Sequence, residues 1–384
     1  MIDWQQLYEK HETKLDRLYD DVEEGKLERL RAFAQKYPEL LVLPRYGEAD
    51  EEGLLHVAAR AGQTANCGLL LELGLAPNQP YVDEGHASAL ELAASEGHLE
   101  TCVCLLDAGA WVDGLPLSVC PPLYAAAQSG HNEVVALLLT RGAQVNRLHR
   151  RANDSALDAA REWGHQRTVD LLLEHGARSI NDVEGADAEG AGQAIVTFVH
   201  NTAGWVLPTE FCPPSEDPRS TLHVSLIDSK TDYKLLFTSG LYQVAPMTEL
   251  FLCLPGDWAL PQAGLPVPDA WCFPVRMLAR LAATTFEHGP VAEGMLFQRD
   301  DPQFADLRWP CAVDALLAVD KPWNKHGDDV RIPESDKVTL LTLAPVKFTG
   351  KGAPTAKALA ALIERKRKAS WKALALEGPT EAPV

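Results

Sequence analysis

Residues 88–109 read "SALELAASEGHLETCVCLLDAG", and this stretch decides the fold of the first half of the chain. Ser88 stands where a helix N-cap belongs, and Glu91 follows three residues later, as in a capping box. Small apolar residues then lead to Gly97, where the chain can turn. A second run, apolar at helical spacing, ends at Gly109, which suits the left-handed residue that closes a helix. The stretch therefore predicts two short helices joined by a tight turn.

The same pattern occurs four times in the first half of the chain. It centres on glycines spaced by 33 to 35 residues, namely Gly62, Gly97, Gly130 and Gly164. A second glycine follows each of them after twelve residues and closes the runs "LLLELG", "CLLDAG", "LLLTRG" and "LLLEHG". A unit of about 33 residues with a turn and two helices has the ankyrin period. Because one unit cannot bury its apolar face alone, neighbouring units are expected to stack.

These segments resemble the ankyrin family over residues 47–181, with Pro122 at the first helical position of the third unit. The resemblance implies an all-α solenoid of about four helix-turn-helix repeats. His56 occupies the family's histidine position, whereas the other units have Glu91, Tyr124 and Asp158 there. The Asp and Gly of the family's turns are mostly missing. Residues 1–46 repeat the helix, glycine, helix rhythm with a more charged face, and we interpret them as an N-terminal helical cap.

The second half of the chain has a different texture. Residues 182–193 are acidic and glycine-rich without apolar periodicity, which predicts a linker. Strands are expected at "LHVSLID", "KLLFTSG", "ELFLCLP" and "KVTLLTLAPV", and helices at "AIVTFVHNTAGWV", "FPVRMLARLAATTF" and "TAKALAALIERKRKASWKAL". The sequence therefore predicts two domains, an ankyrin solenoid followed by an α+β domain.

The α+β domain resembles the Suppressor of fused family over residues 194–376. The motif has several elements in order: Thr238-Ser239-Gly240 after a strand, Met247, Glu249-Leu250 opening a strand that ends in Leu254-Pro255, Trp258, and then Pro274-Val275-Arg276 on a helix with Leu278, Leu281 and Ala282. The family often has methionine after the glycine, where this chain has Leu241. Residues 377–384 are expected to form a tail.

Ser239-Gly240 raises the question of a nucleophile. A serine nucleophile of the GxSxG type needs a sharp elbow, a base and an oxyanion hole, but residue 237 is Phe and the sequence identifies no base. We therefore expect a bend at the end of a strand. No catalytic residue is predicted, and the chain is expected not to be an enzyme.

Other motifs also have a structural interpretation beside a functional one. His98, His131 and His165 each follow a repeat glycine and suggest either a metal site or packing, and the repeat spacing favours packing. Asp300-Asp301 is more typical of a solvated turn than of a cation site. "ERKRK" at 364–368 suits the end of a helix better than nucleic acid in so acidic a chain. No metal and no cofactor is predicted.

Charge is unevenly distributed along the chain. The net charge is −19, which argues against nucleic acid and anionic membranes as partners. Residues 46–113 carry twelve acidic side chains and a single basic one, Arg60. This segment serves either solubility or the binding of a cationic protein. The predicted partner-binding residues are Tyr81, Asp83, Glu84, Glu91, Glu96, Trp111, Asp113 and Tyr124.

The function expected from these features is non-enzymatic protein binding. Suppressor of fused domains sequester a transcription factor in animals, and in bacteria both resemblances point to immunity proteins of polymorphic toxin systems. The leading hypothesis is an antitoxin that occludes a cognate secreted toxin, and the alternative is an intracellular ankyrin scaffold or regulator that binds a host protein. The absence of a signal peptide or membrane span in the sequence predicts a cytoplasmic location. The sequence leaves the oligomeric state open.

Overall fold

A computed structural model describes residues 4–46, 51–79, 87–181, 191–227, 233–262, 267–323, 330–331, 337–348 and 353–379. The chain divides into two compact units, Met1–Ser179 and Ile180–Val384. The predicted linker, 182–193, lies mostly outside the described residues.

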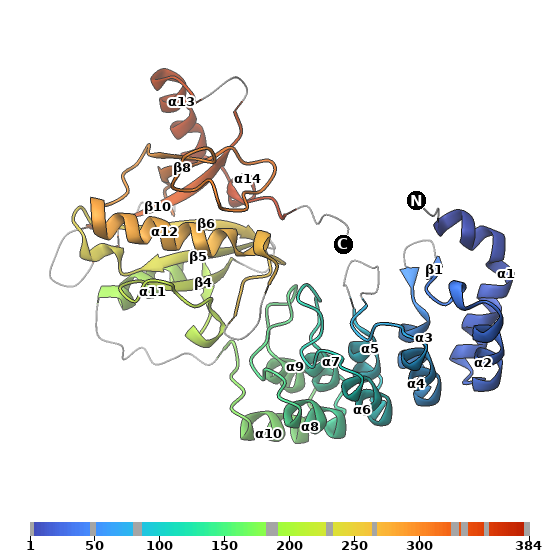
Figure 1. Ribbon diagram of the computed structural model, residues 1–384. Coiled ribbons are helices and arrows are strands. Elements are labelled where there is room, and N and C mark those ends of the chain that lie inside the picture. The colour runs from blue at the N-terminus through green and yellow to red at the C-terminus, as the bar shows by residue number, and fades with distance from the viewer. Residues whose placement is uncertain are drawn as a thin grey trace. The chain divides into compact units, whose positions relative to one another are not determined.

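The first unit contains pairs of short antiparallel helices stacked side by side (Figure 1). One layer consists of α3 (Leu54–Arg60), α5 (Ala89–Ser95), α7 (Pro122–Gln128) and α9 (Ala156–Glu162). The other layer consists of α4 (Thr64–Glu72), α6 (Leu99–Asp107), α8 (Asn132–Thr140) and α10 (Gln166–Glu174). Each pair is one of the four predicted sequence units.

Helix starts follow the local chemistry that the sequence predicts. The Ser88 hydroxyl accepts the N–H of Glu91 at 3.1 Å and so caps α5. Ser155 and Asp158 form a complete reciprocal capping box at α9, and Pro122 is the first residue of α7. At α5 the Glu91 carboxylate accepts a hydrogen bond from the hydroxyl of Ser118, which lies in a later loop.

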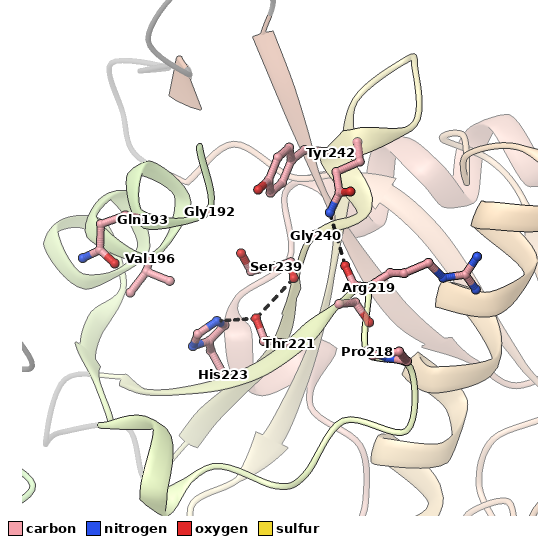
Figure 2. A pocket seen from close by; sticks show the side chains of 12 residues that line it. Gly192, Gln193, Val196, Pro218, Arg219, Thr221, His223, Ser239, Gly240 and Tyr242 are labelled. Atoms are coloured by element: carbon pink, nitrogen blue, oxygen red, sulfur yellow. Dashed lines mark hydrogen bonds between the residues drawn. The ribbon is translucent and has the colours of Figure 1, made fainter. Parts of the chain in front are cut away.

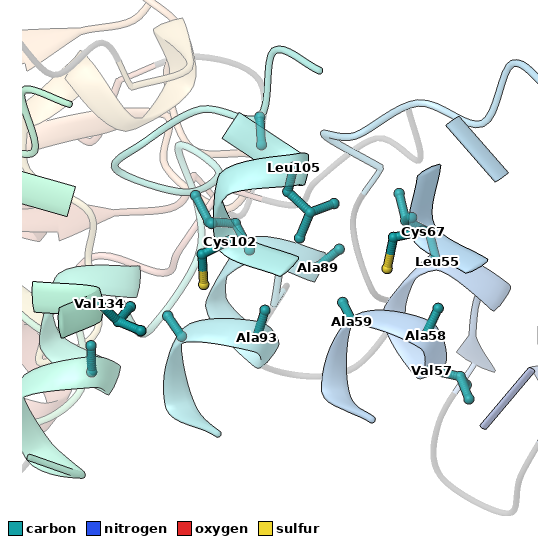
Figure 3. Packing of buried hydrophobic residues seen from close by; sticks show 14 of the residues in the cluster. Leu55, Val57, Ala58, Ala59, Cys67, Ala89, Ala93, Cys102, Leu105 and Val134 are labelled. Carbon is teal, nitrogen blue, oxygen red and sulfur yellow. The ribbon is translucent and has the colours of Figure 1, made fainter. Parts of the chain in front are cut away.

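The core of the first unit runs without interruption through all of the helix pairs. Alanines such as Ala58 and Ala93 are fully buried between neighbouring units, where their small side chains allow the helices to approach closely (Figure 3). Cys67, Cys102 and Leu105 fill the space between the two layers. The eight cysteines are all free thiols.

The N-terminal residues extend this stack with α1 (Trp4–Glu23), α2 (Leu27–Lys36), the 3₁₀ turn η1 (Pro38–Leu40) and a short antiparallel pair, β1 (Arg45–Tyr46) with β2 (Glu51–Glu52). The Asn66 amide donates to the carbonyl of Val22 at 2.9 Å, and the Gln63 amide donates to that of Glu23 at 2.9 Å. The cap thus stacks on α4 through the same kind of contact that joins one repeat to the next.

The second unit is built on one mixed sheet with strand order β3-β4-β5-β6-β10-β8-β7, and β9 pairs with one end of β10. Strands β6 and β10 are parallel, while the other pairs are antiparallel. The strands are β3 (Gly204–Val206), β4 (Thr221–Ile227), β5 (Tyr233–Ser239), β6 (Thr248–Pro255), β7 (Leu296–Gln298), β8 (Ala315–Asp320), β9 (Val330–Arg331) and β10 (Lys337–Val346).

Both faces of this sheet are covered. On one face, Leu235 and Phe237 of β5 pack in a cluster with residues of α11 (Ala191–Thr202), α13 (Ala356–Arg367) and α14 (Trp371–Leu374). Successive strand residues point to opposite faces, so Leu236 faces the other side, where α12 (Phe273–His288) contacts β5. Three 3₁₀ turns complete the unit: η2 (Thr209–Phe211), η3 (Leu241–Gln243) and η4 (Asp269–Cys272). Burial on both faces explains why the central strands are continuous apolar runs.

Most of the expected elements of the second half are present, but the helix expected over "AIVTFVHNTAGWV" spans Ala191–Thr202 and so begins within the predicted linker, while Gly204–Val206 form strand β3 and pair with β4. Strand β10 spans the residues of "KVTLLTLAPV" and lies inside the sheet between β6 and β8. The expected C-terminal helix is instead two helices, because Ser370 caps a new one at α14. Strands β3, β7, β8 and β9 were not predicted.

Candidate binding surfaces and a cleft in the second unit

A ladder of histidines joins the repeats. The Nε2–H groups of His98, His131 and His165 donate to the carbonyls of Arg60, Ser95 and Gln128, each at 3.0 Å. Each ring also lies over the glycine of the preceding unit. At Gly97, which has a φ of +77°, an added Cβ would be 2.5 Å from the Nδ1 atom of His131, so only glycine fits there. The prediction that these histidines serve packing and hydrogen bonding is confirmed.

The position of the ankyrin histidine forms a second ladder. His56 donates to the carbonyl of Gln79 at 3.1 Å. In the following units, Glu91 accepts from the Ser118 hydroxyl at 2.8 Å, the Tyr124 hydroxyl donates to Asp154 at 3.1 Å, and Asp158 accepts from Ser179. Different side chains therefore make equivalent contacts. Each one joins the first helix of its pair, which is α3, α5, α7 or α9, to the loop that follows that pair.

A third set of hydrogen bonds joins the loops that precede the first helices of successive pairs. Asn78 accepts the N–H of Trp111 at 2.8 Å and donates to the carbonyl of Gly109 at 2.9 Å. One repeat further along, Asp113 accepts the N–H of Gln144 at 2.8 Å, and in the repeat after that Asn146 makes the same pair of bonds as Asn78, to the N–H of Arg178 and the carbonyl of Gly176. Burial raises the pKa of Asp113, and the bond from Gln144 opposes that shift.

These ladders change the interpretation of three predicted partner-binding residues. Tyr124 is only 4% exposed and stacks beside His149, so it lies inside the array rather than on its surface. Glu91 and Asp113 are half-buried and use carboxylate oxygens within the array. Sequence reasoning missed these contacts because the partners lie 27 to 31 residues away in the chain. The shared repeat position of Glu91, Tyr124 and Asp158 was nevertheless a usable signal.

The remaining predicted residues divide into two groups. Glu96 is exposed, and the Trp111 side chain is 52% exposed. Tyr81, Asp83 and Glu84 lie outside the described residues. The single cation of the acidic segment, Arg60, already forms a bidentate pair with Glu52, with N–O distances of 3.1 and 3.2 Å. Because Arg60 balances the charge of Glu52, the net negative charge of the segment comes from its other acidic side chains.

Comparison with known proteins identifies the repeats. Residues 118–183 match the family model described as ankyrin repeats (3 copies). The chain therefore contains ankyrin repeats. The ankyrin prediction is thus confirmed, and it implies interaction with proteins in general. The Suppressor of fused resemblance of the second unit stays a prediction.

The relatives share the repeats and only a small part of their length. The chain is 37% identical to the "Ankyrin repeat and KH domain-containing protein mask" of Drosophila melanogaster over 97 residues, which is 25% of this chain and 2% of that protein. It is 36% identical to the "Probable E3 ubiquitin-protein ligase XBOS33" of Oryza sativa subsp. japonica over 116 residues, or 30% of this chain and 22% of that protein. It is 33% identical over 141 residues to the "Transient receptor potential cation channel subfamily A member 1 homolog" of Caenorhabditis elegans, which is 37% of this chain and 11% of that protein.

In the second unit, the structure explains the Ser239-Gly240 bend. The Glu249 carboxylate lies fully buried beneath it and accepts the N–H groups of Gly240 and Tyr242 at 2.8 and 3.1 Å. The Thr238 hydroxyl donates to the same carboxylate at 2.5 Å. Burial raises the pKa of Glu249 to about 7, and these three hydrogen bonds oppose the shift. The acid inside an apolar strand was the sequence signal for this network.

A cleft opens above the bend (Figure 2). Its volume is about 310 Å³, and its walls are the first turn of α11, the start of β4, the end of β5 and η3. Its lining includes Gly192, Gln193, Arg219, Thr221, His223, Ser239 and Tyr242.

The cleft contains an imidazole near Ser239, which the sequence did not reveal. Thr221 bonds His223 Nε2 at 3.0 Å and donates to the carbonyl of Ser239 at 3.2 Å. Burial lowers the pKa of His223 to about 4, so the ring is neutral at pH 7. The partner of this imidazole is Thr221, and no hydrogen bond joins it to the Ser239 hydroxyl. The geometry therefore agrees with a bend and provides no activated serine.

The described residues contain no group of three or more His, Cys, Asp or Glu side chains suited to a metal ion. None of the helices that the structure describes is long and apolar enough to cross a membrane.

Proposed function

We propose that this chain is a non-enzymatic protein-binding module whose ankyrin array contacts a cationic partner. The observation that carries the proposal is Trp111, which exposes 52% of its surface within the acidic segment 46–113. Tryptophan is enriched among residues that dominate binding energies, and the acidic charge of the segment that contains Trp111 would favour a basic protein. Arg60 is paired with Glu52, so it offsets that one carboxylate and leaves the segment strongly acidic.

The more specific proposal is an immunity protein that occludes a secreted toxin. It is supported by the resemblance of residues 194–376 to Suppressor of fused domains and by the acidic array, whose charge would speed association with a basic toxin. The alternative is a scaffold that binds a host protein through the same array. A toxin gene beside the gene for this chain would favour the first, and its absence would favour the scaffold.

The test of the anchor uses two exposed tryptophans of the same array. Trp111→Ala is expected to raise the dissociation rate of the purified neighbouring toxin and to weaken binding by about 2 kcal/mol. Trp163→Ala is the matched control, since Trp163 is 62% exposed but lies outside the acidic segment. Circular dichroism must show both arrays folded. Equal kinetics for wild type and Trp111→Ala would exclude Trp111 as an anchor.

The test of the charge uses the exposed acids Glu96 and Glu100. Their joint replacement by Gln is expected to slow association and flatten its salt dependence, with less change in dissociation, because exposed charges act mainly on encounter. Binding kinetics at two ionic strengths measure this. Unchanged association, with full protection of cells expressing the toxin, would make the acidic segment a solubility feature.

A further inference from the structure

The N-terminal cap contains a second cleft, which is lined by α1 and α2 and has a volume of about 460 Å³. The charged residues that line it share one face of each helix, since they are spaced by one or two helical turns. They are Lys14, Arg17 and Asp21 of α1, and Arg29 and Lys36 of α2. We call it the basic cleft, because its described lining holds four cations and one carboxylate in a chain of net charge −19.

The carboxylate of the basic cleft is already paired. Asp21 is 7% exposed, and its Oδ1 atom accepts a hydrogen bond from Arg29 at 2.8 Å. The same oxygen lies 3.4 Å from the ammonium nitrogen of Lys26. Because two cations balance the charge of Asp21, this carboxylate does little to repel an anion from the cleft.

The other three cations of the cleft are exposed and have no carboxylate partner among the described residues. They are Lys14, Arg17 and Lys36. The ammonium nitrogens of Lys14 and Lys36 lie 4.9 and 5.2 Å from the centre of the Tyr37 ring, so two like charges are held beside one side chain. Like charges at this range repel each other, and an anion bound between them would relieve the repulsion.

The Tyr37 hydroxyl responds to the positive charge of the cleft. A hydrogen bond with Lys36 is the largest cause of its lowered pKa, and Lys14 acts in the same direction. Surroundings that favour a phenolate also favour other anions. The acidic residues elsewhere in the chain oppose this only weakly, because exposed charges more than about 8 Å apart are largely screened at physiological ionic strength.

We propose that the basic cleft binds a small molecule that carries two or three linked phosphate groups. Three cations without a carboxylate partner match a compact multivalent anion better than a single carboxylate, and the guanidinium of Arg17 can bind a phosphate through two parallel hydrogen bonds. The half-buried ring of Phe33 also lines the cleft and offers apolar contact to the rest of the ligand. A volume of about 460 Å³ suits a small molecule, and the net charge of −19 argues against nucleic acid as the source of the phosphates.

Two double variants with the same change in charge separate the cleft from the surface around it. Lys14→Gln/Lys36→Gln removes the two ammonium groups beside Tyr37. Lys10→Gln/Arg31→Gln is the matched control, because Lys10 and Arg31 are exposed cations of the same two helices and do not line the cleft. All four side chains are exposed, so both variants are expected to fold, and circular dichroism checks this.

The experiment is isothermal titration calorimetry of the full chain with inorganic triphosphate, and separately with diphosphate, at pH 7 and constant ionic strength. We expect saturable binding in wild type and in the Lys10→Gln/Arg31→Gln control, with triphosphate bound more tightly than diphosphate. Lys14→Gln/Lys36→Gln is expected to bind triphosphate at least about tenfold more weakly, because hydrogen bonds to charged groups are stronger than those between neutral groups. A hexaglutamate peptide, titrated in parallel, is expected to bind more weakly than triphosphate.

Four outcomes would overturn the proposal. They are the absence of saturable binding in wild type, an unchanged affinity in Lys14→Gln/Lys36→Gln, equal weakening in both double variants, and tighter binding of hexaglutamate than of triphosphate. Equal weakening would mean that the anion responds only to net charge, and tighter hexaglutamate binding would identify an acidic protein segment as the occupant. Because no variant changes Trp111, Glu96 or Glu100, failure here would leave the proposed protein binding unaffected.

Discussion

The two units satisfy their buried polar groups in opposite ways. In the ankyrin array the same hydrogen bond recurs from repeat to repeat, as in the three histidines that bond the carbonyls of Arg60, Ser95 and Gln128. In the second unit a single carboxylate, Glu249, holds the Ser239-Gly240 bend through three hydrogen bonds. The array repeats one contact at several equivalent sites, whereas the second unit uses different contacts at different places, and the Glu249 network occurs once.

This difference determines how each unit tolerates substitution. At the family's histidine position, the array accepts His56, Glu91, Tyr124 and Asp158, because each needs only to reach a loop that follows its own repeat. At Glu249 the partners are two fixed backbone N–H groups and a buried hydroxyl, so both the size and the chemistry of the side chain are constrained. We therefore expect a substitution at Glu249 to lower the free energy of unfolding strongly, and substitutions at the repeated positions of the array to lower it by smaller amounts.

The largest effect is expected at Glu249. Glu249→Ala would leave Thr238 and the N–H groups of Gly240 and Tyr242 without their acceptor in a buried site, and we expect a loss of about 3 to 5 kcal/mol. Glu249→Gln, which keeps the size and one acceptor oxygen, should cost less. Denaturant unfolding followed by tryptophan fluorescence measures this loss, since Trp258 is buried in the second unit. Equal stability of Glu249→Ala and wild type would contradict this role of Glu249.

The sequence predicted repeated features better than single ones. Glycines at 33 to 35 residue intervals and the Ser155 cap were visible because each follows a local rule that the array applies several times. Strand β10 was predicted from its apolar run, but its parallel pairing with β6 was not, since pairing depends on residues far apart in the chain. The cleft beside Ser239 was also missed. Its walls bring residues near 192, 221 and 239 together, and no spacing in the sequence encodes that meeting.

In the array, the next largest effect is expected from a cavity. Leu138 of α8 is fully buried, and Leu138→Ala should cost about 3 kcal/mol by removing packed methyl groups from the stack. Because repeats interact mainly with their neighbours, far-ultraviolet circular dichroism of the helical array should report an earlier transition than the fluorescence of Trp258. Simultaneous loss of both signals would mean that the two units unfold together.

The pH dependence separates the two units further. The folded-state pKa of Glu249, about 7, is raised above the usual value of 4.5, so folding favours its protonated form. This contribution to stability is fully present below about pH 4.5 and is lost as the pH rises through 7. We expect wild type to lose about 2 kcal/mol between pH 5 and pH 7 relative to Glu249→Gln, measured by urea unfolding at each pH. Parallel pH profiles would contradict this raised pKa.

The smallest effect is expected at Asp113, and it tests whether repeat positions are interchangeable. Asn78 and Asn146 accept one backbone N–H and donate to one carbonyl, whereas Asp113 can only accept. Asp113→Asn keeps the acceptor, supplies the missing donor and removes a carboxylate whose pKa burial raises.

We therefore expect Asp113→Asn to change the free energy of unfolding by less than about 1 kcal/mol, in the stabilising direction, while Asp113→Ala should lose about 1 to 2 kcal/mol. Urea unfolding of the array, followed by circular dichroism, compares both variants with wild type. A loss of more than about 1 kcal/mol in Asp113→Asn would mean that the negative charge of Asp113 itself is needed. Its attraction to Arg147 would be the reason, because Arg147 bonds the backbone carbonyl of Asp113 and its positive charge acts to lower the pKa of the Asp113 carboxyl. If Asp113→Asn is as stable as wild type, the charge of Asp113 can be removed in binding experiments without disturbing the ankyrin array.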